Sequence, residues 1–65
     1  MTLIINGEAR DVAAPSLAAL LEALELDAAV VATAVNGRFV RRADRMVTLL
    51  AEGDAIEILA PMQGG

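Results

Sequence analysis

The sequence predicts an α+β fold in which a single helix lies across one sheet of four to five strands. Three patterns support this prediction. Two Asn-Gly pairs each separate two extended runs, leucines recur with helical spacing near residue 20, and the last apolar run alternates as a strand does. We expect one domain over residues 1–60 and a flexible C-terminal tail at 61–65.

The first expected element is a β-hairpin. Thr2–Ile5 is a short apolar run, Asn6-Gly7 follows, and Glu8–Val12 resumes an extended pattern. Asn-Gly between two such runs predicts a two-residue type I′ turn, because both central residues of that turn need a positive φ.

A helix is expected at residues 17–25. Ser16 is a good N-cap, because its hydroxyl can accept a hydrogen bond from a first-turn N–H group. Four leucines then follow at i, i+3, i+4 and i+7, which is one apolar stripe of a helix: Leu17, Leu20, Leu21 and Leu24. We expect this stripe to pack on the sheet.

A second hairpin is expected after the helix. Val30–Val35 is rich in β-branched residues and predicts a strand, which Asn36-Gly37 turns into Arg38–Val40. The charged segment Arg41–Arg45 is expected to be irregular, and Met46–Leu50 to form a brief strand.

Ala55–Ala60 is the last expected strand, and Pro61 ends it because proline has no N–H to donate. The first and last strands both carry apolar residues at alternate positions, so we expect them to be central neighbours. If they run parallel, the chain between them is the long crossover that a parallel pair requires.

Composition excludes several classes of function. The chain has no cysteine and no histidine, so thiolate or imidazole metal sites and Cys–His or Ser–His nucleophilic pairs are excluded. The net charge of −4 disfavours a nucleic-acid partner and favours a protein partner with a basic surface. No apolar run is long enough for a membrane span, so we expect no membrane partner and a cytoplasmic location.

The chain also has no lysine, so its one primary amine is the α-amino group of Met1. If the C-terminus is activated as an acyl donor, no side-chain amine of the same chain can intercept it. Compositional bias explains the absence equally well.

The chain ends in Gly64-Gly65. Glycine has no Cβ, so the wall of a partner's site can approach the backbone closely and the terminal carboxylate stays accessible. Fully extended, residues 61–65 reach about 17 Å from the last strand. A carboxylate is not displaced at neutral pH without activation, so its chemistry would need ATP or an equivalent, supplied by a partner. The alternative is a frayed terminus without function.

Several segments along the chain match one family: Ile5–Glu8, Ser16 with Leu20–Glu22, Ala34–Gly37 with Phe39–Arg41, and above all Glu52–Ile58 and Pro61–Gly65. In these residues the chain resembles the ThiS family, the sulfur carrier proteins of thiamine biosynthesis. The resemblance covers essentially the whole chain and implies a β-grasp fold, as in ubiquitin.

The resemblance also implies the chemistry of the chain end. A ThiF-type activating enzyme would adenylate the carboxylate of Gly65, using ATP and magnesium. A sulfur-transfer enzyme would convert it to a thiocarboxylate, and the thiazole synthase ThiG would receive the sulfur. Gly64 would keep the segment narrow and flexible, and Gln63 and Met62 would line the entry to the partner's site. The chain would be a carrier without a bound cofactor, not an enzyme.

Leu59 and Ile4 lie opposite the expected core positions of their strands. We expect them to form a partly exposed apolar patch for partner docking. The alternative is that they are ordinary isolated surface residues.

Four arginines form a local basic cluster: Arg38, Arg41, Arg42 and Arg45. We expect a solvated loop in which they pair in part with Asp44, the alternative being contact with an acidic patch on a partner.

Other functions remain open at the level of sequence. A sulfur carrier of another pathway, such as the small subunit of molybdopterin synthase, would use the same terminal chemistry. A protein modifier conjugated to lysines, or a β-grasp binding module with an inert tail, is also compatible. Enzymatic activity is least favoured, because no acidic residues point to a convergent pair in a cleft.

Overall fold

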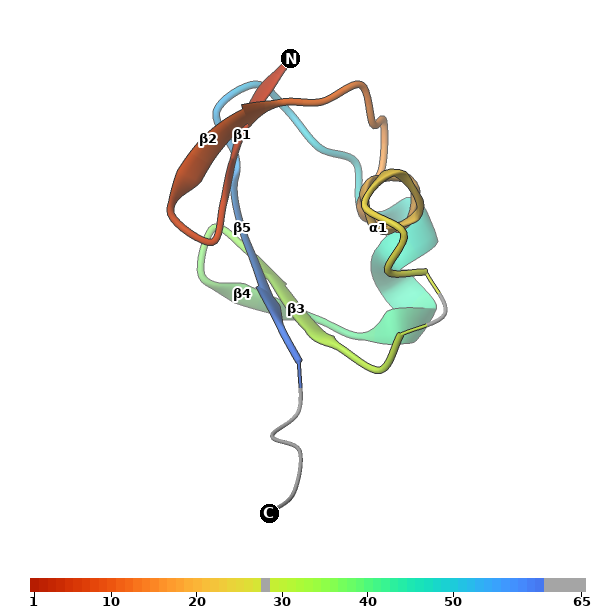
Figure 1. The fold of residues 1–65 in the computed structure, drawn as a ribbon. Coiled ribbons are helices and arrows are strands. Elements are labelled where there is room, and N and C mark those ends of the chain that lie inside the picture. The colour runs from red at the N-terminus through yellow and green to blue at the C-terminus, as the bar shows by residue number, and fades with distance from the viewer. Residues whose placement is uncertain (28, 61–65) are drawn as a thin grey trace.

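The computed structural model describes residues 1–27 and 29–60. Within them, five strands form one mixed sheet in the order β2-β1-β5-β3-β4, and helix α1 lies across one of its faces (Figure 1). The strands are β1 (Thr2–Ile5), β2 (Glu8–Asp11), β3 (Ala32–Val35), β4 (Arg38–Val40) and β5 (Ala55–Leu59). The helices are α1 (Leu17–Ala23) and the 3₁₀-helix η1 (Arg42–Val47). The predicted α+β architecture is confirmed.

Both Asn-Gly pairs form the turns that the sequence predicts. The φ angles are 50° and 84° at Asn6 and Gly7, and 51° and 82° at Asn36 and Gly37. Positive φ at both central residues is the property of a type I′ turn, which suits the twist of antiparallel strands. The turns accordingly join β1 to β2 and β3 to β4 as antiparallel hairpins.

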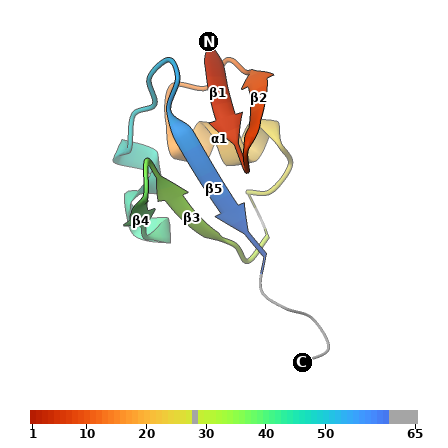
Figure 2. The same ribbon diagram turned by 90° about the vertical axis from the view of Figure 1, so that its left-hand side faces the viewer.

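Strand β5 lies at the centre of the sheet, between the two hairpins (Figure 2). It runs parallel to β1, with Ile4 opposite Ala55, and antiparallel to β3, with Ala32 opposite Leu59. The expected central parallel pair is therefore confirmed. Because β1 and β5 run in the same direction, the N-terminus and the end of β5 lie at opposite ends of the sheet (Figure 2).

The core lies between α1 and the face of the sheet that α1 covers. It is made of buried apolar residues from β1, β5, α1 and the flanking loops: Leu3, Ile5, Ala14, Leu17, Leu20, Leu21, Leu50, Ile56 and Ile58. The Ser16 hydroxyl accepts a hydrogen bond from the Ala19 N–H at 3.2 Å and caps α1 as expected. The predicted end of the helix is wrong by two residues, because Leu24 is the C-cap and Glu25 has a φ of 61°.

The expectations for Arg41–Arg45 and Met46–Leu50 are wrong. The first segment enters the 3₁₀-helix η1, which continues to Val47, and no named strand lies between η1 and β5. The segment after η1 makes only an isolated bridge between Leu49 and Ser16. A helical turn is favoured here because it brings Arg45 inward, where β3 supplies hydrogen-bond partners.

The arginine cluster is a solvated loop only in part. Nε of Arg41 lies 3.1 Å from Oδ2 of Asp44, as expected for an exposed pair. Arg45 is instead buried, and its guanidinium donates to Oγ1 of Thr33 and to the carbonyl of Val31. The arginine side chain is long enough to reach from η1 to hydrogen-bond acceptors beneath it. The alternation of apolar and polar residues in the sequence does not indicate that Arg45 is buried.

Candidate functional site

The end of β5 is the described part of the chain from which residues 61–65 continue. Ile58 is held there by the side-chain amide of Asn6. Oδ1 of Asn6 accepts from the Ile58 N–H at 2.8 Å, and Nδ2 donates to the Ile58 carbonyl at 3.0 Å. On the opposite edge, β3 pairs with β5 as far as Leu59. The strand is therefore held on both edges close to its last residue.

The beginning of β5 is held by the second Asn-Gly turn. The Asn36 N–H donates to the Ala55 carbonyl at 2.7 Å, and Oδ1 of Asn36 accepts from the Ala55 N–H at 2.9 Å. Nδ2 of Asn36 also donates to Oδ1 of Asp54 at 3.0 Å. This hydrogen bond and one from the Ala51 N–H hold the pKa of Asp54 below its ordinary value of 3.8. Each turn thus fixes one end of the central strand.

The predicted reacting and access residues lie outside the described residues: Gly65, Gly64, Gln63 and Met62. The described part of the chain shows the strand that precedes these four residues and the surface around that strand.

One face of the sheet carries no helix within the described part of the chain (Figure 2). We call it the outer face. Its residues alternate with the core positions and lie beside one another across the strands: Thr2, Ile4, Ala9, Asp11, Ala32, Ala34, Phe39, Ala55, Glu57 and Leu59. Most of its side chains are apolar, and Glu57 is a charged residue near its centre. It is a broad surface that another protein can approach.

Both predicted docking residues lie on the outer face, but they are not neighbours. Ile4 lies beside Ala55 at the start of β5, and Leu59 lies beside Ala32 at its end. Leu59 lies four positions after Ala55 on the strand, which is about 13 Å. Leu59 is 63% exposed, whereas Ile4 is half-buried. Of the two, Leu59 is next to the end of β5 and more available to a partner.

Phe39 is an outer-face residue that sequence reasoning missed as a docking candidate. It is 69% exposed and pairs with Ala34, which in turn pairs with Glu57 of β5. An aromatic residue after an Asn-Gly turn is a detectable pattern, but its face depends on the register of β4 against β3. The exposed phenyl ring adds the largest apolar side chain of this surface.

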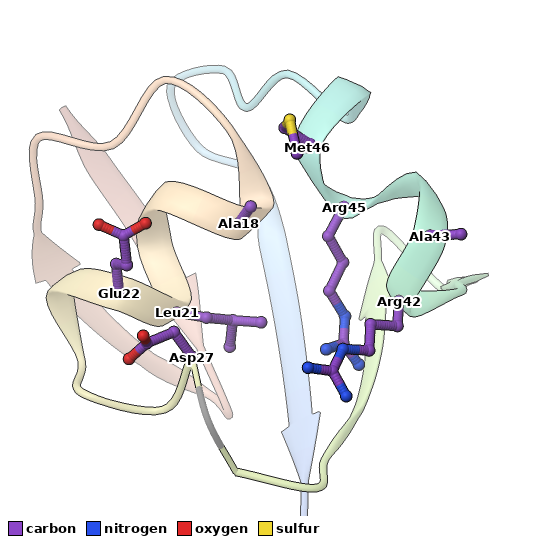
Figure 3. Close-up of a pocket in the computed structure, with 8 residues that line it drawn as sticks. All are labelled: Ala18, Leu21, Glu22, Asp27, Arg42, Ala43, Arg45 and Met46. Carbon is purple, nitrogen blue, oxygen red and sulfur yellow. The ribbon is translucent and has the colours of Figure 1, made fainter.

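A separate hollow of about 560 Å³ lies between α1 and η1 (Figure 3). Arg42 and Arg45 enter it from η1, and the carboxylates of Glu22 and Asp27 lie on the α1 side. None of its lining residues comes from β5. This hollow is therefore remote in sequence and topology from the residues expected to react.

The described side chains provide no evident catalytic constellation. Over residues 1–27 and 29–60, no three acidic side chains gather so that they could hold a metal ion. The α-amino group of Met1, the one primary amine of the sequence, lies 3.1 Å from Oδ1 of Asp11. The N-terminus is at the far end of the sheet from the end of β5 (Figure 2). In the same ranges, no helix is long and apolar enough to cross a membrane.

Comparison with known proteins identifies the family. The ThiS family model matches residues 3–65. Two solved structures from Geobacter metallireducens are similar over the whole chain. A crystal structure of the thiamine biosynthesis protein ThiS is 36% identical, with a TM-score of 0.83 and all of that chain covered. A solution NMR structure of a thiamine biosynthesis protein is 33% identical, with a TM-score of 0.81 and 88% covered. No curated protein sequence matches significantly.

The five-stranded mixed sheet with one helix across it is the β-grasp fold of these relatives, so the chain is a ubiquitin-like protein. The match over nearly every residue narrows this class to one family. The chain belongs to the ThiS family, the sulfur carrier proteins of thiamine biosynthesis.

Proposed function

We propose that this protein carries sulfur for thiamine biosynthesis on the C-terminal carboxylate of Gly65. The observation that supports this most directly is the extent of the family match, which runs to the last residue and includes Gly64-Gly65. A match confined to the β-grasp domain would indicate the fold but would not indicate a function for the C-terminus.

The proposed chemistry takes place on partner proteins. A ThiF-type enzyme joins the Gly65 carboxylate to AMP from magnesium-bound ATP and releases pyrophosphate. A sulfur-transfer enzyme then supplies sulfur at the oxidation level of sulfide, which attacks the acyl carbon of the adenylate. AMP leaves, and a thiocarboxylate remains at Gly65. The thiazole synthase ThiG takes this sulfur. The carrier supplies the acyl group and the surface that partners recognise, which is compatible with a sequence lacking cysteine and histidine.

We further propose that the outer face is the docking surface for the activating enzyme. Leu59 and Phe39 are exposed apolar side chains on it, and exposed apolar patches commonly mark protein interfaces. Gly65 lies six positions after Leu59 in the sequence, about 20 Å when extended. An enzyme that binds this face can therefore hold an active site within reach of the chain end. The net charge of −4 favours a basic surface on that enzyme.

The experiment is to incubate the protein with the activating enzyme of its host, ATP, magnesium and a sulfur source. We expect the intact mass to show one oxygen replaced by sulfur, and fragmentation to locate the change at Gly65. A variant lacking Gly64-Gly65 is the matched control and should remain unmodified. An unmodified wild-type chain, or sulfur at another position, would contradict the proposal. A binding module with an inert tail would keep its activity in the truncated form.

A further inference from the structure

The parallel pairing of β1 with β5 ends in an unusual way at Asn6. The backbone N–H of Asn6 donates to the Ile56 carbonyl at 2.9 Å. The chain then turns through Gly7 into β2, so β1 has no further residue to pair with Ile58. The Asn6 side chain takes that place and bonds both the N–H and the carbonyl of Ile58. A carboxamide can do this because it carries a donor and an acceptor, as a peptide group does.

This pair of hydrogen bonds is the last attachment of β5 to the β1 side among the described residues. On the other side, β3 pairs with β5 up to Leu59, where β3 itself begins at Ala32. Only Leu59 and Ala60 stand between Ile58 and residue 61. The Asn6 amide is therefore close to the point from which the reactive end extends, although 52 residues separate it from Ile58.

We infer that Asn6 is a positioning residue: its side-chain amide fixes the end of β5, the point from which residues 61–65 continue, relative to the docked outer face. This inference rests on the proposed function. If β5 loosens at Ile58, the point of departure moves back along the strand, and each freed residue adds about 3.4 Å of reach. Reacting atoms must approach within about 3–3.5 Å, so a shift of one residue is as large as that whole distance.

The effect on kinetics distinguishes positioning from stability, because this protein is a substrate of the activating enzyme. Partial unfolding lowers the concentration of competent substrate, which raises the apparent KM and leaves kcat at saturation unchanged. If the C-terminus of a docked carrier is displaced, the carrier still occupies the enzyme but reacts less often. Loss of positioning therefore lowers kcat and leaves KM nearly unchanged.

The chain offers a matched pair of variants, Asn6→Gly and Asn36→Gly. Both positions have a positive φ, which glycine tolerates, and both substitutions remove a side-chain amide bonded to β5. They differ in acting at the end and at the beginning of that strand. In the adenylation assay, we expect Asn6→Gly to lower kcat by about tenfold or more with KM within about threefold. Asn36→Gly should leave kcat within about twofold.

Hydrogen exchange tests the same inference without any partner. The Ile58 N–H should exchange faster in Asn6→Gly than in Asn36→Gly, and the Ala55 N–H should show the reverse. If Asn6→Gly does not fold, Asn6→Asp serves instead, since it keeps an acceptor for the Ile58 N–H but loses the donor to its carbonyl. It should also lower kcat at nearly constant KM.

Equal kcat values for the two glycine variants, or unchanged exchange at Ile58 in Asn6→Gly, would overturn the inference. Failure of the wild-type protein to be activated at all would refute the proposed function, and with it the positioning inference. Exchange at Ile58 would still show whether the Asn6 attachment itself exists.

Discussion

Oγ1 of Thr33 accepts a hydrogen bond from Nε of Arg45 at 3.0 Å and donates one to the Val40 carbonyl at 2.7 Å. The two side chains are only 1% and 7% exposed. Nη2 of Arg45 also donates to the Val31 carbonyl at 2.6 Å. These bonds join η1 to the β3–β4 hairpin and give two nitrogens of the buried guanidinium a hydrogen-bond partner. They explain why one member of the basic cluster is part of the interior.

Thr33→Val should therefore destabilise the fold by about 1–3 kcal/mol, because the change keeps the shape but leaves Nε of Arg45 and the Val40 carbonyl without this partner. Urea unfolding followed by circular dichroism measures the loss. Thr2→Val is the control, since Thr2 also lies on a strand and its hydroxyl makes no hydrogen bond to the described residues. Equal losses of unfolding free energy in the two variants would show that the hydrogen bonds of Thr33 make no specific contribution to stability.

The cap of α1 should contribute measurably, because the helix has only seven residues. Ser16→Ala removes the acceptor of the Ala19 N–H and should cost about 1 kcal/mol. Ser16→Asp keeps an acceptor at the same position and should retain most of the stability. Thermal unfolding of the three proteins tests this, and a Ser16→Asp variant as unstable as Ser16→Ala would contradict it.

Acid should weaken the attachment at the start of β5. The hydrogen bond from Asn36 is the main cause that lowers the pKa of Asp54 below 3.8 in the folded protein. A lowered folded-state pKa stabilises the fold fully above the unfolded value, and this stabilisation is lost as pH falls through the folded value. In Asn36→Gly the pKa of Asp54 should rise toward 3.8, as an NMR titration of its carboxyl carbon would show.

The stability difference between wild type and Asn36→Gly should accordingly narrow as pH is lowered below 3.8. An unchanged Asp54 pKa in the variant would contradict the assignment of Asn36 as its main cause.

Leu59→Asp should weaken activation without unfolding the protein, because the side chain is 63% exposed on the outer face. If the activating enzyme buries Leu59, a carboxylate there should raise KM by about tenfold or more. Met46→Asp is the matched control, because Met46 is 77% exposed but lies on η1, beside the hollow facing α1 (Figure 3). Similar KM values for both variants would place the docking surface elsewhere.

Local sequence chemistry determined much of this protein. Asn-Gly predicts two type I′ turns because few residues adopt positive φ readily, and Ser16 predicts the start of α1 because its hydroxyl can cap it. Alternation identified the core side of β1 and β5. The terminal Gly64-Gly65, which directs attention to the chain end, is also a property of sequence alone and lies outside the described residues.

Tertiary structure decided what depends on partners distant in the chain. Burial of Arg45 required β3 beneath η1, and the same contact replaced the expected strand after Arg45 with a 3₁₀-helix. The register of β3 against β4 placed Phe39 on the outer face, and the register of β1 against β5 placed Leu59 far from Ile4. The bond from Asn6 to Ile58 arose in the same way, because the turn residue can replace a missing strand partner only once β5 lies beside β1.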